Sequence, residues 1–251
     1  MKLNCDMGEA FGPWKMGLDD QIMPYVDQAN IACGFHASDP LTMAHTVALA
    51  KQNNVSIGAH PGYPDLVGFG RRNMDIAPAE LKAIIHYQVG ALKGICASQN
   101  TKIDYVKPHG ALYNQMMADS AILETVMQAL SELDTRLPLM VGAVPEAPAI
   151  REMAKQYGLI VWFEAFADRL YTDEGRLTPR KLPNAVHASY ALIEQQVKQL
   201  CESGTVISGT GKVLTIHADT ICVHGDGIHA VEAVTKLRTI VDAFNQRKSQ
   251  L

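Results

Sequence analysis

Apolar and polar positions along the chain follow two different patterns. Short, mostly apolar runs predict β-strands, and they cover residues 3–6, 26–32, 55–59, 139–143 and 159–164, with one more starting at Tyr105. Longer segments with an apolar residue at every third or fourth position predict amphipathic helices. These cover residues 41–51, 78–98, 120–133, 146–157, 188–202 and a last helix from Asp226-Gly227 to about Phe244. Asp39-Pro40 predicts a helix start, because a capping carboxylate precedes proline at the first helical position.

This alternation predicts an α/β protein with about seven β–α units and a parallel sheet. Further short strands are expected at residues 206, 213–216 and 221–223. A doubly wound open sheet is the competing architecture, and it gathers its ligands near one switch point. Here reactive residues follow early, middle and late strands alike, which favours a closed (β/α)7-like, distorted TIM-type barrel. With no linker or low-complexity tract, we expect residues 1–251 to form one domain.

Composition narrows the class of partner. The formal net charge of −4 gives no reason to expect nucleic acid or an anionic membrane as a partner, and a mean hydropathy of −0.01 leaves no room for a spanning run. The chain turns polar directly after Met1, which predicts a cytoplasmic protein. Five cysteines without a Cys-x-x-Cys pair favour reduced thiols, and Cys5, Cys33 and Cys222 are expected to pack within strands.

Reactive side chains gather directly after the predicted strands. The stretch from Tyr105 to Tyr113 sets a lysine, an imidazole and a phenol at a strand's C-terminal end, and four other strands end in the same way. Chemistry at the ends of successive strands is how α/β barrels build active sites. Four histidines occupy equivalent positions there: His36, His60, His109 and His224. One such histidine is usually structural, but four indicate a shared site for proton transfer or metal binding.

Charged residues at the same ends extend this site. Asp6 and Glu9 could bind a metal or divide acid and base roles, although a turn or capping aspartate is the plain alternative. Lys107 could neutralise a carboxylate or an oxyanion, or else form a structural ion pair. Asp226 is either catalytic or an N-cap.

A long Gly- and Pro-rich loop at residues 61–72 is typical of a functional loop. Its Arg71 and Arg72, with Arg169 elsewhere, are candidate clamps for a carboxylate or phosphate, or else loop-stabilising ion pairs. Asn30, Tyr113 and Asp168 are further expected substrate contacts.

The sequence motifs of three other enzyme classes are incomplete or missing. The stretch at residues 204–213 lacks the serine or threonine that ends a P-loop, Gly68-Phe69-Gly70 lacks the third glycine of a dinucleotide fingerprint, and no Gly-x-Ser-x-Gly elbow occurs. The chain therefore shows no nucleotide site of its own.

Taken together, the motifs resemble the LamB/YcsF family over nearly the whole chain. They lie at residues 4–9, 29–37, 58–61, 68–72, 107–114, 166–171 and 224–226. One departure is Ser38, which stands where the family usually has glycine. The resemblance implies a barrel related to sugar deacetylases and other metal-using hydrolases. It also implies the ATP-dependent ring opening of 5-oxoproline (pyroglutamate) to L-glutamate, in which partner subunits B and C activate the lactam with ATP and this chain opens the ring.

The resemblance also implies roles for single residues. Asp6, His60 and His109 match the ligands of a divalent metal such as Zn, Mn or Mg. Glu9 or Asp226 would be the general base, and His36 or His224 the acid to the leaving nitrogen. Lys107 would stabilise the oxyanion, and an arginine would hold the substrate carboxylate.

Two rival functions stay open. The first is a stand-alone metal-dependent deacetylase or amidohydrolase acting on a small acylated substrate. The second is a binding module that delivers a small acid to a partner enzyme. Association into a homo-oligomer is left open as well.

Overall fold

The computed structural model describes residues 1–187, 189–224 and 230–250. Its strands are β1 (Lys2–Met7), β2 (Gln28–Ala32), β3 (Ser56–His60), β4 (Tyr105–Val106), β5 (Leu139–Gly142), β6 (Val161–Phe166), β7 (Thr205–Ile207), β8 (Val213–Thr215) and β9 (Thr220–Val223). Its helices are α1 (Asp19–Ile22), the 3-10 turn η1 (Met23–Tyr25), α2 (Pro40–Gln52), α3 (Pro78–Ser98), α4 (Gly110–Ala118), α5 (Ser120–Leu133), α6 (Ala147–Gln156), α7 (Tyr190–Ser203) and α8 (Ala230–Ser249). None of the described helices is long and apolar enough to cross a membrane.

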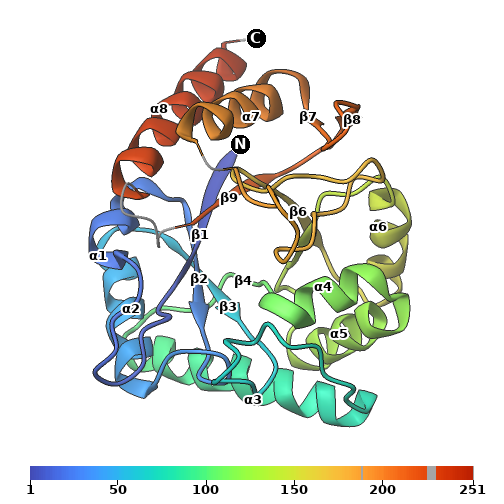
Figure 1. Cartoon of the computed structure of the whole chain (residues 1–251). Coiled ribbons are helices and arrows are strands. Elements are labelled where there is room, and N and C mark those ends of the chain that lie inside the picture. The colour runs from blue at the N-terminus through green and yellow to red at the C-terminus, as the bar shows by residue number, and fades with distance from the viewer. Residues whose placement is uncertain (188, 225–229, 251) are drawn as a thin grey trace.

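Seven parallel strands close into a barrel, which helices surround (Figure 1). The strand order is β1-β2-β3-β4-β5-β6-β9, and pairing of β1 with β9 completes the ring. This confirms the predicted barrel and excludes the open sheet. The expected strands at residues 206 and 213–216 form a separate antiparallel pair, β7–β8. Because all barrel strands run in one direction, their C-terminal ends meet at one rim.

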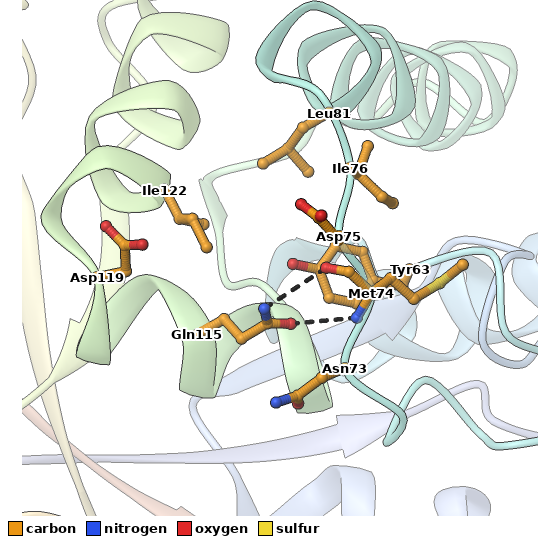
Figure 2. Close-up of a pocket in the computed structure, with 9 residues that line it drawn as sticks. All are labelled: Tyr63, Asn73, Met74, Asp75, Ile76, Leu81, Gln115, Asp119 and Ile122. Atoms are coloured by element: carbon orange, nitrogen blue, oxygen red, sulfur yellow. Dashed lines mark hydrogen bonds between the residues drawn. The ribbon is translucent and has the colours of Figure 1, made fainter.

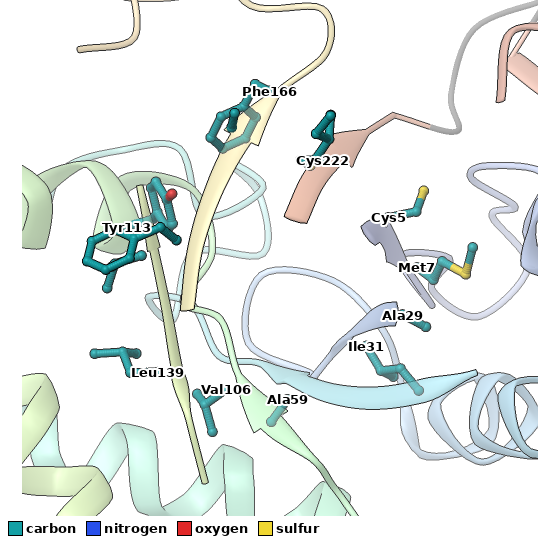
Figure 3. Close-up of a cluster of buried hydrophobic side chains, with 14 of the residues drawn as sticks. Cys5, Met7, Ala29, Ile31, Ala59, Val106, Tyr113, Leu139, Phe166 and Cys222 are labelled. Atoms are coloured by element: carbon teal, nitrogen blue, oxygen red, sulfur yellow. The ribbon is translucent and has the colours of Figure 1, made fainter. Parts of the chain in front are cut away.

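Side chains alternate between the two faces of the barrel wall. Apolar residues such as Cys5, Met7 and Ile31 are buried and belong to the hydrophobic core shared with the helices (Figure 3). Between them, Asn4 and Asn30 are fully buried and join side chain to side chain across β1 and β2 at 2.8 Å. The barrel therefore has a polar interior beneath the site at the rim.

Tyr105 fills much of this interior. Its side chain is fully buried, and its hydroxyl donates to Asn30 Oδ1 at 2.6 Å. A Cβ on Gly58, in the neighbouring strand, would lie 2.2 Å from the tyrosine ring. Glycine at position 58 is thus required by the size of Tyr105.

Helix boundaries follow local chemistry. Asp39 caps α2 by accepting hydrogen bonds from the Leu41 and Thr42 N–H groups at 2.9 and 3.1 Å, as predicted. The predicted start of the last helix at Asp226-Gly227 lies outside the described residues. Its predicted end near Phe244 is wrong, because α8 continues to Ser249. Asn245 explains the extension, since its side chain bonds both the amino group and the carbonyl of Met1.

Candidate active site

Three of the predicted histidines form a compact cluster at the rim. The rings of His36 and His109 stack with centroids 3.6 Å apart and planes within 2°, while His60 stands perpendicular to both. His36 follows β2, His60 ends β3 and His109 follows β4, so three neighbouring strands place them. Each of the three is at most 5% exposed.

Backbone carbonyls fix the tautomers of two of these rings. His60 Nδ1 donates to the Lys107 carbonyl at 2.6 Å, and His109 Nε2 donates to the Phe69 carbonyl at 2.9 Å. When both rings are neutral, His60 Nε2 and His109 Nδ1 each carry a lone pair. These two atoms face each other at 3.0 Å. Two facing lone pairs are unfavourable, so this contact needs a proton on one of the two nitrogens or a metal ion beside them.

Asp6 and Glu9 supply negative charge to the cluster. Asp6 Oδ2 lies 3.4 Å from His60 Nε2, and Glu9 Oε1 lies 3.6 Å from His36 Nε2 and 3.7 Å from His109 Nδ1. Burial, with the charge of Asp6, raises the pKa of Glu9 to about 7. Burial also opposes ionisation of Asp6, but His60 and Lys107 outweigh it and hold the pKa of Asp6 well below its usual value. The two carboxylates are thereby driven to different protonation states near neutral pH.

This cluster could hold a metal ion. Glu9, His36, His60 and His109 each offer one ligand atom, and the four atoms lie within 4.8 Å of one another. Burial and the neighbouring imidazoles lower the pKa values of His36 and His109, so both stay neutral, as metal binding requires. Neither ring nitrogen of His36 has a hydrogen-bond partner among the described residues. This group contains His60 and His109 of the ligand set expected from the resemblance, together with Glu9 and His36. Asp6, the third expected ligand, is not in this group, although its Oδ2 lies 3.4 Å from His60 Nε2.

Lys107 lies beneath the cluster, inside the barrel. It is 2% exposed, and its Nζ lies 2.9 Å from Asp6 Oδ1 and 3.1 Å from Glu164 Oε2. Burial disfavours the ammonium, but the adjacent Asp6 carboxylate, Cys222 and Glu164 raise its pKa well above the ordinary value. Sequence reasoning missed Glu164, although a charged residue inside the apolar run 161–166 was an available signal.

Asn30 is bound within the barrel interior. It is fully buried, and its Nδ2 donates to Asp6 Oδ1 at 2.7 Å and to Asn4 Oδ1 at 2.8 Å. Because the Tyr105 hydroxyl also donates to Asn30 Oδ1, both the nitrogen and the oxygen of the amide have partners. Asn30 thus contacts Asp6, a side chain of the rim site, from inside the barrel.

A second polar group lies on the other side of the rim. His224 Nδ1 donates to Asp168 Oδ2 at 2.8 Å, and Arg180 approaches His224 Nε2 at 3.3 Å. Burial lowers the pKa of His224, but Asp168 more than reverses this and raises it. Asp6, Cys222 and His224 have ligand atoms within 4.8 Å of one another, so this group adjoins the histidine cluster.

Tyr113 also belongs to the second group. It is buried beside Phe166, with ring centroids 6.1 Å apart. Burial, together with the neighbouring Glu164 carboxylate, raises the pKa of Tyr113 well above its usual value. The hydroxyl therefore lies beside Glu164, the carboxylate that also pairs with Lys107.

The three arginines have different environments. Arg71 stacks on Phe69 at 5.0 Å, and its charge acts on Glu9 and His36. Arg72 pairs with Asp65 and is 66% exposed. Arg169 is buried, and its guanidinium donates to the carbonyls of Ala185 and Thr178. Of the three, Arg71 is the one placed where it can act on the cluster. Asp226, the other expected base, lies outside the described residues.

The loop between β3 and α3 covers the cluster. Gly70 has a φ of +62°, and a Cβ there would lie 2.7 Å from His36 Cβ and 2.8 Å from His109 Cδ2. The same loop borders a separate pocket of about 470 Å³, against α4 and α5 (Figure 2). There Gln115 bonds the N–H and the carbonyl of Met74. No histidine is among the described residues that line this pocket.

Known proteins resemble this chain from end to end. The profile of the LamB/YcsF family matches residues 1–251. The chain belongs to the LamB/YcsF family. It is 51% identical to the second 5-oxoprolinase A subunit of Pseudomonas putida, over 96% of this chain and 94% of the relative. It is also 51% identical to the 5-oxoprolinase A subunit of Vibrio parahaemolyticus, over 95% and 94% of the two chains.

Solved structures agree with this assignment. The lactam utilization protein of Thermus thermophilus is 37% identical and superposes with a TM-score of 0.88, over 97% of this chain and 96% of that one. In this LamB/YcsF chain, the motifs that carried the resemblance are the segments that supply Asp6, His36, His60 and His109 to one rim.

Proposed function

We propose that this chain opens the lactam ring of 5-oxoproline to give L-glutamate, as one component of an ATP-dependent 5-oxoprolinase. The relatives' names support this substrate. The observation that carries the proposal is the buried cluster in which Glu9, with a pKa of about 7, adjoins three histidines. A carboxylate near neutrality beside neutral imidazoles suits hydrolysis of an unreactive amide.

The chemistry assigns a separate task to each side of the rim. A lactam is a resonance-stabilised amide, so its opening needs a base for water and an acid for the departing nitrogen. Glu9 is the base. His224, whose pKa Asp168 raises against the effect of burial, is the acid. Atoms balance when water supplies a hydroxyl to the carbonyl carbon and the nitrogen leaves with a proton.

Substrate contacts are proposed for Arg71 and Tyr113. The Arg71 guanidinium stacks on Phe69 beside the cluster and is placed to meet the substrate carboxylate, and Tyr113 lies next to Phe166 on the other side of the rim. Lys107 already lies between Asp6 and Glu164. We therefore assign it to keeping Asp6 ionised, in place of the expected oxyanion contact.

Asp6, His60 and His109 are the residues that would hold a divalent metal such as Zn, Mn or Mg. Their fit rests on the facing lone pairs of His60 and His109 and on the ionised state of Asp6. When bound, such an ion lowers the pKa of water and polarises a carbonyl. Both imidazoles are oriented before binding, because the carbonyls of Lys107 and Phe69 hold them.

Partner subunits would supply the ATP chemistry. The chain lacks a phosphate-binding loop of its own. Its relatives are named as A subunits of 5-oxoprolinase, which implies further subunits. We propose that subunits B and C bind ATP and activate the lactam before this chain opens it.

The test is to purify the chain alone and with the products of its neighbouring genes, and to assay glutamate release from 5-oxoproline with and without ATP. Metal analysis accompanies the assay. The proposal expects release only from the combined proteins with ATP. Turnover of an acylated substrate by the chain alone, without ATP, would instead support the stand-alone amidohydrolase.

A further inference from the structure

A buried glutamine of α3 holds the backbone of the loop that follows β3. Gln88 is 0% exposed. Its Oε1 accepts from the Gly62 N–H at 3.0 Å, and its Nε2 donates to the Gly62 carbonyl at 2.8 Å. The Nε2 also donates to the Ile84 carbonyl at 3.2 Å. One amide thus satisfies both backbone groups of a buried residue.

The segment held in this way touches all three histidines of the cluster. His60 lies two residues before Gly62. The His109 N–H donates to the Pro61 carbonyl at 2.8 Å. A Cβ on Gly62 would lie 2.8 Å from His36 Nδ1, so the backbone there rests against that imidazole. A shift of this segment would move His60 directly and remove support from the other two rings.

A second glutamine has the same relationship to another loop of the rim. Gln196 of α7 is 6% exposed, and its Nε2 donates to the carbonyls of Phe166, Ala167 and Arg169. Like Gln88, it lies on the helix that follows the strand whose loop it holds, here β6. That loop carries Asp168, and none of the three clustered histidines lies on it. It therefore offers a matched comparison.

We propose that Gln88 is a positioning residue for the histidine cluster. An apolar side chain at position 88 would leave the N–H and the carbonyl of Gly62 buried without partners. The loop would then move to regain those hydrogen bonds, and His60 Nε2 would no longer face His109 Nδ1. This inference deepens the proposed function and rests on it only for the kinetic readout.

The test variant is Gln88→Met, which keeps the length of the side chain and removes its donor and acceptor. In the reconstituted complex we expect kcat to fall about tenfold or more with KM little changed, because small misplacements of reacting groups act on this scale. The second readout uses the isolated chain. Histidine ¹⁵N NMR distinguishes the Nδ1–H from the Nε2–H tautomer, and the signals of His60 and His109 should shift.

The matched control is Gln196→Met, which loses an amide of similar burial but should leave the signals of His36, His60 and His109 unchanged. If Gln88→Met does not fold, Gln88→Glu replaces it, since the carboxylate keeps the acceptor and removes the donor. Wild-type kcat with wild-type histidine signals in a folded Gln88 variant would overturn the proposal. Equal shifts of the three signals in Gln196→Met would also overturn it. Should the wild-type complex release no glutamate, the proposed function fails while the NMR comparison still decides the role of Gln88.

Discussion

His60 Nε2 and His109 Nδ1 face each other at 3.0 Å while the other nitrogen of each ring donates to a backbone carbonyl. The pair is thus set for either a shared proton or a metal ion. Everything proposed for the site depends on this arrangement.

Metal binding is the first prediction. Zn²⁺ or Mn²⁺ titrated into the metal-free chain should bind at about one ion per chain by calorimetry, and His60→Ala should weaken the affinity at least about tenfold, because it removes one of the two facing nitrogens. His45→Ala, on the exposed side of α2, is the control and should bind as the wild type does. Equal affinity in the His60 variant would place the ion elsewhere.

Among the polar residues inside the barrel, Lys107 should cause the largest loss of stability when it is replaced without a second change. Lys107→Met leaves Asp6 and Glu164 buried without their cation, and we expect a loss of about 3–5 kcal/mol in the free energy of unfolding. Adding Glu164→Gln should restore part of this loss, since one buried charge is then removed. Urea denaturation of the two single variants and the double variant measures the coupling. Additive losses would mean that Lys107 and Glu164 do not interact.

The pKa of Glu9 predicts a pH dependence. As a base, Glu9 must be ionised, so kcat/KM of the complex should rise as the pH increases through about 7. The sign for stability is opposite. The pKa of Glu9 is raised on folding from 4.5 to about 7, so the metal-free chain should lose stability as the pH rises across this window. Glu9→Gln should flatten both profiles, and an unchanged stability profile in that variant would assign the titration to another group.

Ser38 adopts a strained backbone conformation that favours glycine. Its φ of 75° lies in the left-handed region, and it is fully buried. Ser38→Gly should raise the free energy of unfolding by about 0.5–1 kcal/mol, because the steric cost of the Cβ is removed. Asn54 has a φ of 55°, and asparagine tolerates this conformation, so Asn54→Gly should change stability less. A destabilised Ser38→Gly variant would contradict this account.

The sequence predicted those parts of the molecule that depend on local pattern. Helix α3 begins and ends at the predicted residues, because its apolar spacing is regular and Pro78 opens it. His36, His60 and His109 were found together because barrel strands deliver their ends to one rim. Both predictions needed only the order of residues along the chain.

Contacts between distant segments could not be predicted in this way. Arg72 was an expected clamp, yet its partner Asp65 is brought to it only by the fold of the loop. Gln88 looked like any polar residue of an amphipathic helix, and only the packing of the helix on the loop reveals its role. A sequence does not show which backbone groups will be buried without a partner.

The most direct test is the rate of glutamate release from 5-oxoproline and ATP by the chain recombined with its partner subunits, measured for the wild type and for His109→Ala. Removing this imidazole takes away the ring that stacks on His36 and faces His60. We predict a loss of at least about a hundredfold, the scale on which a general base contributes, because His109 Nδ1 lies 3.7 Å from the proposed base Glu9 and supports its position. A folded His109→Ala variant with wild-type activity would show that the ring is opened elsewhere.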